Sequence, residues 1–197
     1  MKFGHRGLDR LLEVEPGIVT AIVGKAGTGK TTLALALSRD AERPYLVDTE
    51  GISLERVRQV GAMHLKIARV RDFGKQHRML TRLKVKADLL VVDSLVLLYR
   101  LKLMEDYQEA NAMLSRQISA LHRLAEEKEI PVVVTGHVYR TEDGLQIIGG
   151  DIIKYWTKAL LFLERLGPGK RRAILVKHRS RPEGSSCKFR LCDRGLC

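Results

Sequence analysis

The sequence predicts an α/β fold with a mostly parallel central sheet, helices on both faces and antiparallel strands at the C-terminal end. Two observations support this class. Short apolar runs bounded by turn residues alternate with helical patterns through most of the chain, which is typical of parallel strands joined by crossover helices. After residue 158, apolar runs follow one another across a Gly-Pro-Gly turn, which predicts hairpin-connected strands. With 197 residues, we expect one domain spanning 1–197.

Each expected parallel strand is a nearly continuous apolar run, as burial on both faces of a sheet requires. These strands are expected at 18–23, 45–49, 65–70, 89–93 and 130–135, and the helices begin near Lys30, Ser53, Phe73 and Tyr107. The appended strands are expected at 159–163, 173–176 and 187–192, with a turn at 167–170.

A glycine-rich segment after the first expected strand is the most specific motif in the chain. Residues 24–31, GKAGTGKT, fit the G-x-x-x-x-G-K-[ST] pattern of a phosphate-binding loop between a strand and a helix. In such a loop the backbone N–H groups surround the phosphates, Lys30 reaches the β and γ oxygens, and the Thr31 hydroxyl can bind Mg²⁺. The motif predicts nucleoside triphosphate binding. The expected contact residues are Gly24, Lys25, Ala26, Gly27, Thr28, Gly29, Lys30, Thr31 and Thr32.

Acidic residues follow two of the expected buried strands, at the sheet edge that also carries the phosphate loop. Asp93 ends the run LLVVD and is the expected Mg²⁺ partner of Thr31, a role favoured over simple capping by the phosphate loop upstream. Glu50, in VDTEG, is the candidate catalytic base that orients and deprotonates water, with Lys30 as the catalytic cation. Sequence spacing does not decide whether Asp48 or Glu50 is instead a loop cap.

The formal net charge of +12 is large enough to attract a polyanion, and nucleic acid is the expected one. A generic solvated surface is the alternative. Cations concentrate between residues 170 and 194, which favours a localised basic face. The DNA contacts expected there are Lys170, Arg171, Arg172, Lys177, Arg179 and Arg181.

The chain opens without a secretory leader pattern, and its apolar runs are too short to cross a bilayer. We therefore expect a cytoplasmic protein with no membrane partner. Cys187, Cys192 and Cys197 are an odd number without paired C-x-x-C spacing, so we expect three free thiols.

Together these residues resemble the RecA/RadA recombinase family, and most closely its archaeal RadB paralogues. Besides GKAGTGKT and LLVVDS, the resemblance rests on VDTEG, VVVTGHV, GGDIIKYW, KHRSRPEG and FRLCDRG, which follow the family's order over nearly the whole chain. It implies a RecA-like P-loop ATPase core that binds ATP, Mg²⁺ and DNA. It also implies a role in homologous recombination and repair, with a recombinase or another repair protein as partner.

The resemblance implies roles for single residues. Glu50 matches the family's water-activating glutamate, and Arg56 lies near its adenine-stacking arginine. His137 lies where recombinases usually carry a phosphate-sensing glutamine. A strand-end histidine with a satisfied hydrogen bond is an equally good interpretation of His137.

Residues 99–102, YRLK, resemble the family's first DNA loop, so Arg100 and Lys102 are expected DNA contacts and Tyr99 a stacking ring. The alternative places Tyr99 in the core and leaves Arg100 solvated. The loop 139–149 is shorter than the family's second DNA loop, and the chain begins almost directly at the ATPase core. We therefore expect no N-terminal helical DNA-binding domain, weak ATP hydrolysis and no strand exchange by this protein alone.

Two other functions remain open on the sequence. One is a nucleotide-gated structural mediator in which hydrolysis is incidental, and the other is a KaiC-like signalling ATPase or a P-loop kinase. The sequence leaves the oligomeric state and the preferred DNA structure undecided.

Overall fold

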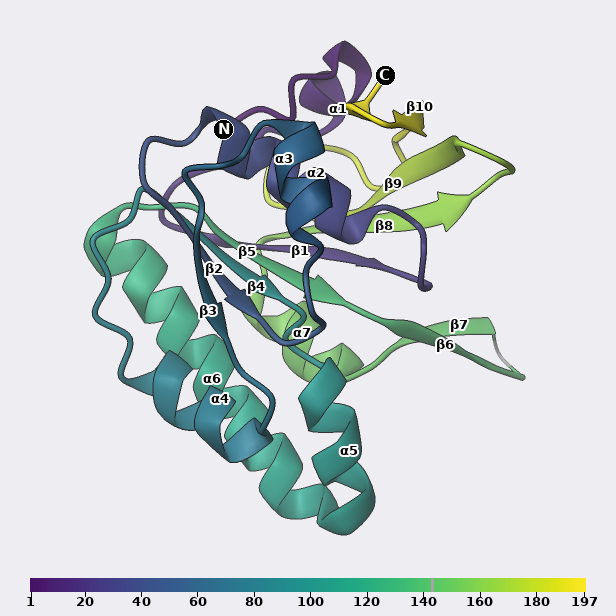
Figure 1. Ribbon diagram of the computed structural model, residues 1–197. Coiled ribbons are helices and arrows are strands. Elements are labelled where there is room, and N and C mark those ends of the chain that lie inside the picture. The colour runs from purple at the N-terminus through teal and green to yellow at the C-terminus, as the bar shows by residue number, and fades with distance from the viewer. Residues whose placement is uncertain (143) are drawn as a thin grey trace.

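The computed structural model describes residues 1–142 and 144–197, and within these residues nine strands form one sheet with helices on both faces (Figure 1). Its parallel strands are, in spatial order, β8 (Ala159–Arg165), β1 (Val19–Gly24), β5 (Val132–Gly136), β4 (Leu89–Asp93), β2 (Pro44–Asp48) and β3 (Lys66–Arg69). The predicted α/β class is confirmed, and the five strands that were predicted as parallel, β1, β2, β3, β4 and β5, each lie within two residues of their expected bounds.

The antiparallel end of the sheet adds β9 (Lys170–His178), β10 (Ser186–Cys192) and β11 (Gly195–Leu196). The expectation that all strands after residue 158 are antiparallel is wrong for β8, which runs parallel to β1 and antiparallel only to β9. The physical reason is the connection: α7 (Gly150–Trp156) returns the chain to the edge at which β1 begins. A strand reached through such a crossover enters the sheet in the parallel direction.

The helices α2 (Lys30–Asp40), α3 (Leu54–Val60), α4 (Phe73–Thr81) and α6 (Tyr107–Lys128) begin where the sequence predicts. Polar caps fix three of these starts, because Ser53, Asp72 and Asp106 each accept a backbone N–H of the first turn. Three helices and one hairpin were not predicted from the sequence: α1 (Arg6–Leu11), α5 (Leu97–Glu105), α7 and the hairpin of β6 (Val138–Thr141) with β7 (Gly144–Ile147).

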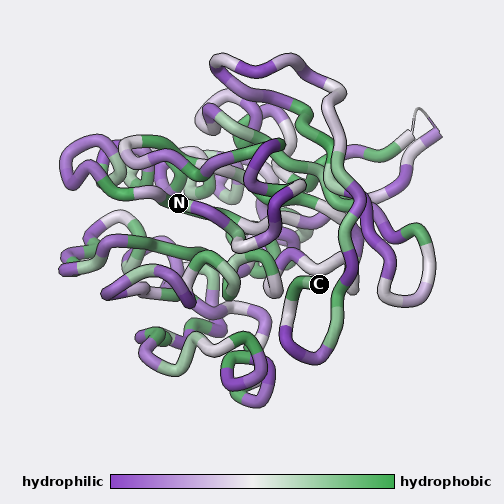
Figure 2. Tube along the Cα trace, turned by 90° about the horizontal axis from the view of Figure 1, so that it is seen from above, coloured by the Kyte–Doolittle hydropathy of each residue, from purple (hydrophilic) through white to green (hydrophobic). Residues whose placement is uncertain are grey.

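Successive strand residues point to opposite faces of the sheet, and each face has its own core. Leu89 and Val91 of β4 join the core beneath α1, α2 and α3, whereas Leu90 and Val92 join the core beneath α4, α5, α6 and α7. Figure 2 shows the same separation, with hydrophobic segments concentrated in the interior and hydrophilic segments in many peripheral loops. No helix in the described part of the chain combines the length and apolar character needed to cross a bilayer.

The β10–β11 hairpin ends the chain and is closed by a disulfide. Cys192 pairs with Gly195 across the hairpin, and a disulfide joins Cys192 to Cys197, whose Cα atoms lie 6.2 Å apart. The expectation of three free thiols is therefore wrong for Cys192 and Cys197. Their sequence spacing fits no disulfide or metal motif, and it is the tight turn between β10 and β11 that brings the two cysteines together. Cys187 is a free thiol, and burial raises its pKa.

Candidate nucleotide and DNA sites

The glycine-rich loop connects the end of β1 to the start of α2, and its glycines are required by the backbone. Gly27 and Gly29 have φ values of 71° and 102°, in the left-handed region that glycine favours. A Cβ on Gly24 would lie 2.5 Å from the carbonyl oxygen of Leu163. Among the described residues no side chain caps the start of α2, so its first N–H groups are available to an anion.

Lys30 is buried at the mouth of this loop. Its Nζ donates to the carbonyl oxygens of Gly24 and Lys25, at 3.2 and 3.1 Å. Desolvation lowers the pKa of the Lys30 ammonium, and the nearby carboxylates of Glu50 and Asp93 oppose this effect. A phosphate group would add negative charge beside the ammonium and offset its desolvation further, so the position fits the predicted role.

Asp93 lies at the end of β4 between two threonine hydroxyl groups and is 2% exposed. Thr31 Oγ1 donates to its Oδ2 at 2.7 Å, and the hydroxyl of Thr135 donates to its Oδ1. Burial raises the pKa of the Asp93 carboxyl, against the lowering effect of these hydrogen bonds. A hydroxyl and a carboxylate are hard oxygen donors, and Mg²⁺ would give this carboxylate an opposite charge, so Thr31 and Asp93 fit the ion.

Glu50 lies after β2 and His137 lies after β5, and the two side chains meet. His137 Nε2 lies 2.5 Å from Glu50 Oε1. The pKa of the Glu50 carboxyl is lowered chiefly by this hydrogen bond, against the raising effect of desolvation. His137 is thus a strand-end histidine with a satisfied hydrogen bond, and its partner is the candidate catalytic base.

Asp48, not Glu50, caps the loop after β2. Its Oδ1 accepts the backbone N–H groups of Gly51 and Ile52, at 2.7 and 3.1 Å. Its Oδ2 lies 3.7 Å from Arg69 and 3.4 Å from Arg71. The carboxylate of Glu50 therefore remains available for chemistry near the phosphate loop.

Arg56 of α3 lies beside the start of α2 and is held there by the C-terminal hairpin. Its Nη1 donates to the carbonyl oxygens of Cys192 and Asp193, at 3.0 and 3.1 Å, and its Nη2 reaches Thr32 Oγ1 at 3.4 Å. The guanidinium therefore lies beside Thr32 at the start of α2, and its stacking on adenine stays a prediction. Sequence reasoning did not anticipate the hairpin in this position.

Arg171 also supports the phosphate loop, although the sequence suggested a DNA contact. It is 8% exposed, and its Nη2 donates to the carbonyl oxygen of Gly27 at 2.9 Å. Its Nη1 donates to Gly167 and Lys170, at 3.1 and 2.9 Å. Desolvation, followed by the charge of Arg165, lowers the pKa of Arg171. A side chain engaged in this way has its donors directed into the protein.

The other expected DNA contacts lie in several places. Arg172 of β9 pairs with Glu164 of β8, and Lys102 of α5 pairs with Glu109 and Glu105. At the far end of β9 lie three more cations, each bonded to a neighbouring group: Lys177 to the Lys154 carbonyl, Arg179 to Glu15, and Arg181 to the Arg10 carbonyl. Lys170 and Arg100 are exposed. The structure does not bring these residues together on one face.

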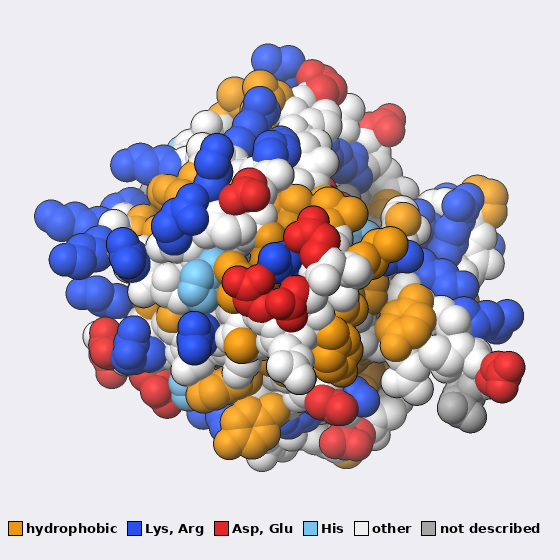
Figure 3. All heavy atoms as spheres, turned by 90° about the horizontal axis from the view of Figure 1, so that it is seen from below, with side chains coloured by type: hydrophobic (Ala, Val, Ile, Leu, Met, Phe, Trp, Pro, Cys, Tyr) orange, Lys and Arg blue, Asp and Glu red, His pale blue; other side chains and the backbone are white. Residues whose placement is uncertain are grey.

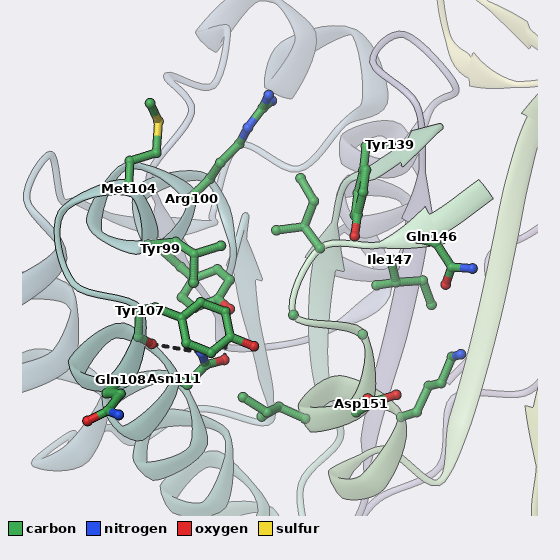
Figure 4. Close-up of a pocket in the computed structure, with 16 residues that line it drawn as sticks. Tyr99, Arg100, Met104, Tyr107, Gln108, Asn111, Tyr139, Gln146, Ile147 and Asp151 are labelled. Carbon is green, nitrogen blue, oxygen red and sulfur yellow. Dashed lines mark hydrogen bonds between the residues drawn. The ribbon is translucent and has the colours of Figure 1, made fainter. Parts of the chain in front are cut away.

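An aromatic groove of about 980 Å³ lies between α5, the start of α6, the β6–β7 hairpin and α7 (Figure 4). Tyr107 and Tyr139 are 69% and 48% exposed and reach it from opposite walls. Tyr99 is 2% exposed, and its hydroxyl donates to Asn111 Oδ1 at 3.0 Å. Tyr99 is therefore a core residue and not the expected stacking ring, and Arg100 lines the groove.

The site and the sheet together define a class of protein. A phosphate loop after β1, a buried aspartate bonded to its threonine and a glutamate after β2 surround one point at the carboxyl ends of the strands. A parallel sheet with this arrangement is a RecA-like P-loop nucleotide-binding domain.

Comparisons with known proteins identify the family within this class. Residues 17–159 match the model of the AAA domain family. The chain is 34% identical to DNA repair and recombination protein RadB of Methanococcoides burtonii, covering 96% of this chain and 93% of that protein. It is 35% identical to the RadB protein of Archaeoglobus fulgidus, covering 98% and 96%. A solved structure described as the RadB recombinase has a TM-score of 0.87 at 33% identity, covering 99% of this chain and 97% of that one. The chain belongs to the RadB family.

Proposed function

We propose that this protein binds ATP, Mg²⁺ and DNA in homologous recombination and DNA repair, hydrolyses ATP weakly and does not exchange strands by itself. The observation that carries the proposal is the constellation of Lys30, Thr31 and Asp93 around the glycine loop. The names of the relatives supply the biological setting, DNA repair and recombination. A recombinase or another repair protein is the proposed partner, and the cytoplasm is the proposed location.

The side chains of the nucleotide site have separate tasks in this proposal. The N–H groups of the loop bind the phosphates, and Lys30 exchanges its two carbonyl contacts for phosphate oxygens. Thr31 and Asp93 hold Mg²⁺, which supplies neutralisation of phosphate charge. Arg56 provides a flat cationic surface for the base, positioned by the carbonyl groups of the C-terminal hairpin.

Slow hydrolysis follows from the state of Glu50. In this proposal its carboxylate orients and deprotonates the attacking water. The hydrogen bond from His137 lowers the pKa of Glu50, and a carboxylate with a lower pKa is a weaker base. One of its oxygens is also engaged by His137 Nε2. The pair thus favours the ATP-bound state over turnover, which also suits a nucleotide-gated structural mediator.

Single-stranded DNA is the proposed occupant of the aromatic groove. Tyr107 and Tyr139 offer two exposed rings on which bases can stack, and Arg100 supplies a cation at the groove. The exposed Lys170 adds to the electrostatic attraction but lies elsewhere on the surface. Phosphate attraction and stacking are both tolerant of sequence, so we expect weak sequence preference.

The test is ATP turnover and DNA affinity measured on one preparation, without nucleotide, with ADP and with ATP–Mg²⁺. We expect nucleotide-dependent DNA binding, slow turnover in the wild type, and undiminished ATP–Mg²⁺ binding without turnover in Glu50→Gln. Full turnover by Glu50→Gln contradicts the role of Glu50. DNA affinity that ignores nucleotide contradicts the proposed coupling, and phosphate transfer to a protein or small molecule favours a kinase.

A further inference from the structure

A second groove lies on the surface between the loop after α4 and the C-terminal half of α6. We call it the basic groove; its volume is about 530 Å³. It is lined on one side by residues 80–86 and on the other by Ala120, Arg123, Leu124, Glu127 and Lys128. Figure 3 shows lysine and arginine side chains gathered along one edge of the molecule, on the side where Figure 1 places this loop and the end of α6.

The loop side of the basic groove alternates between cations and apolar residues. In residues 82–87, RLKVKA, Arg82, Lys84 and Lys86 are exposed, whereas Leu83 and Val85 are half-buried. This period of two is typical of an extended chain with one face turned to the protein. The cations therefore form a row above an apolar floor that Leu80 and Leu124 extend.

The charge of the basic groove is largely uncompensated. Five cations and one acid line it, and among the described residues the ion pair within this set is Arg123 with Glu127, at 3.9 Å. Arg82, Lys84, Lys86 and Lys128 have no ion pair in the part of the chain that the structure describes. A negatively charged occupant would thus find several free partners.

The backbone of this loop is also unpaired. Within residues 1–142 and 144–197, no backbone N–H or C=O group of residues 83–87 makes a hydrogen bond to the protein. Pairing resumes at Asp88, whose N–H donates to the carbonyl of Arg43 at 3.3 Å. An extended segment with free donors and acceptors can accept a partner strand by main-chain pairing.

We propose that the basic groove binds an extended acidic segment of a partner protein, with an apolar side chain of that segment entering between Val85 and Leu124. The acidic side chains of such a segment can pair with the cations, its apolar side chain can pack on the apolar floor, and its backbone can hydrogen-bond to residues 83–87. Nucleic acid would satisfy the cations alone. The acidic turn of a second copy of this chain does not fit the basic groove. Its residues Glu105 and Glu109 lie in helices α5 and α6 rather than in an extended segment, and both already pair with Lys102.

The groove is separate from the nucleotide site. The loop of residues 82–87 leads into the amino end of β4, whereas the phosphate loop follows the carboxyl end of β1. Because these strands are parallel, the basic groove and the phosphate loop lie at opposite ends of the strands. Binding of the acidic segment therefore leaves the phosphate loop accessible.

The test uses a fluorescein-labelled synthetic peptide in which glutamate and aspartate alternate with leucine and phenylalanine. Two comparison peptides replace either the acids by lysine or the apolar residues by serine. The protein variant is Lys84→Glu combined with Lys86→Glu. The matched control is Lys158→Glu combined with Lys188→Glu, which changes the net charge equally at exposed positions elsewhere.

We expect the acidic–apolar peptide to bind the wild type and the control, and to bind Lys84→Glu/Lys86→Glu at least about tenfold more weakly. The two comparison peptides should bind more weakly than the first. Amide hydrogen exchange in residues 83–87 should slow when the acidic–apolar peptide is bound. Equal affinity of both protein variants, equal binding of the serine peptide, or unchanged exchange in this loop overturns the proposal. Displacement of the peptide by single-stranded DNA, with the DNA affinity itself lost in Lys84→Glu/Lys86→Glu, also overturns it in favour of a nucleic-acid site.

Discussion

Arg171→Ala should destabilise the protein and weaken nucleotide binding, because Arg171 links β9 to the phosphate loop. The guanidinium donates three hydrogen bonds, to Gly27, Gly167 and Lys170, and is 8% exposed. A hydrogen bond involving a charged group stabilises by about 1.5–3 kcal/mol. Two of the acceptors lie near the turn 167–170, where water can replace the arginine, so only the bond to Gly27 counts in full. With the lost packing of the side-chain stem, we expect a loss of about 2–4 kcal/mol.

This loss corresponds to a melting temperature lower by roughly 5–15 °C in a chain of this size. Urea unfolding and calorimetric ATP titration measure the two effects, with Lys170→Ala as the matched control because Lys170 is exposed and adjacent. We expect the control to keep wild-type stability and ATP affinity. Arg171→Ala should leave the salt dependence of DNA affinity unchanged. Wild-type stability and ATP affinity in Arg171→Ala, together with a flatter salt dependence, would refute the reasoning and return Arg171 to the DNA contacts.

Three further predictions concern the nucleotide site. Asp93→Asn should raise the Mg²⁺ requirement for ATP binding without lowering the melting temperature of the nucleotide-free protein, because burial raises the pKa of Asp93; an unchanged Mg²⁺ titration contradicts its role. The lowered pKa of Glu50 stabilises the fold above about pH 5, and this contribution is lost as pH falls. His137→Ala should therefore reduce the loss of unfolding free energy on acidification, measured by urea unfolding as a function of pH. A wild-type pH profile in this variant contradicts the interaction of His137 with Glu50. Cys192→Ser should weaken ATP affinity severalfold, as should reduction of the wild type, by loosening the carbonyl groups that hold Arg56; calorimetry showing no change in either contradicts that support.

The parallel half of the sheet is predictable because its signal is local. A strand such as LLVVD is buried on both faces, so its whole length is apolar and its ends are marked by polar residues. The direction of β8 is not encoded by its own residues, since the run ALLFL is compatible with a parallel or an antiparallel strand. The helix that determines its direction, α7, is seven residues long and too short to give a clear helical period. Helix α5 was missed because it follows β4 closely and its N-cap residue is the apolar Val96, which gives no capping signal in the sequence.

The residues of the nucleotide site likewise fall into those that a local motif predicts and those that it does not. Lys30, Thr31 and Asp93 were predicted because each lies within a short motif whose spacing reflects its chemistry. Thr135 and Arg171 were not predicted as parts of this site. Their contacts arise between strands far apart in sequence, as when the pairing of Val92 with Val134 across β4 and β5 brings Thr135 to Asp93. A threonine in an otherwise apolar strand was the available signal for Thr135.

Calorimetric titration of the wild type and Lys30→Ala with ATP–Mg²⁺ tests the central claim most directly. The wild type should bind, and Lys30→Ala should lose tight binding because the ammonium that offsets phosphate charge is absent. The melting temperature of Lys30→Ala should change little. Lys30 makes two hydrogen bonds, both to loop carbonyl oxygens, and water can bind these oxygens once the side chain is removed. Unchanged ATP affinity in a folded Lys30→Ala protein would contradict the assignment of the glycine loop as the nucleotide site.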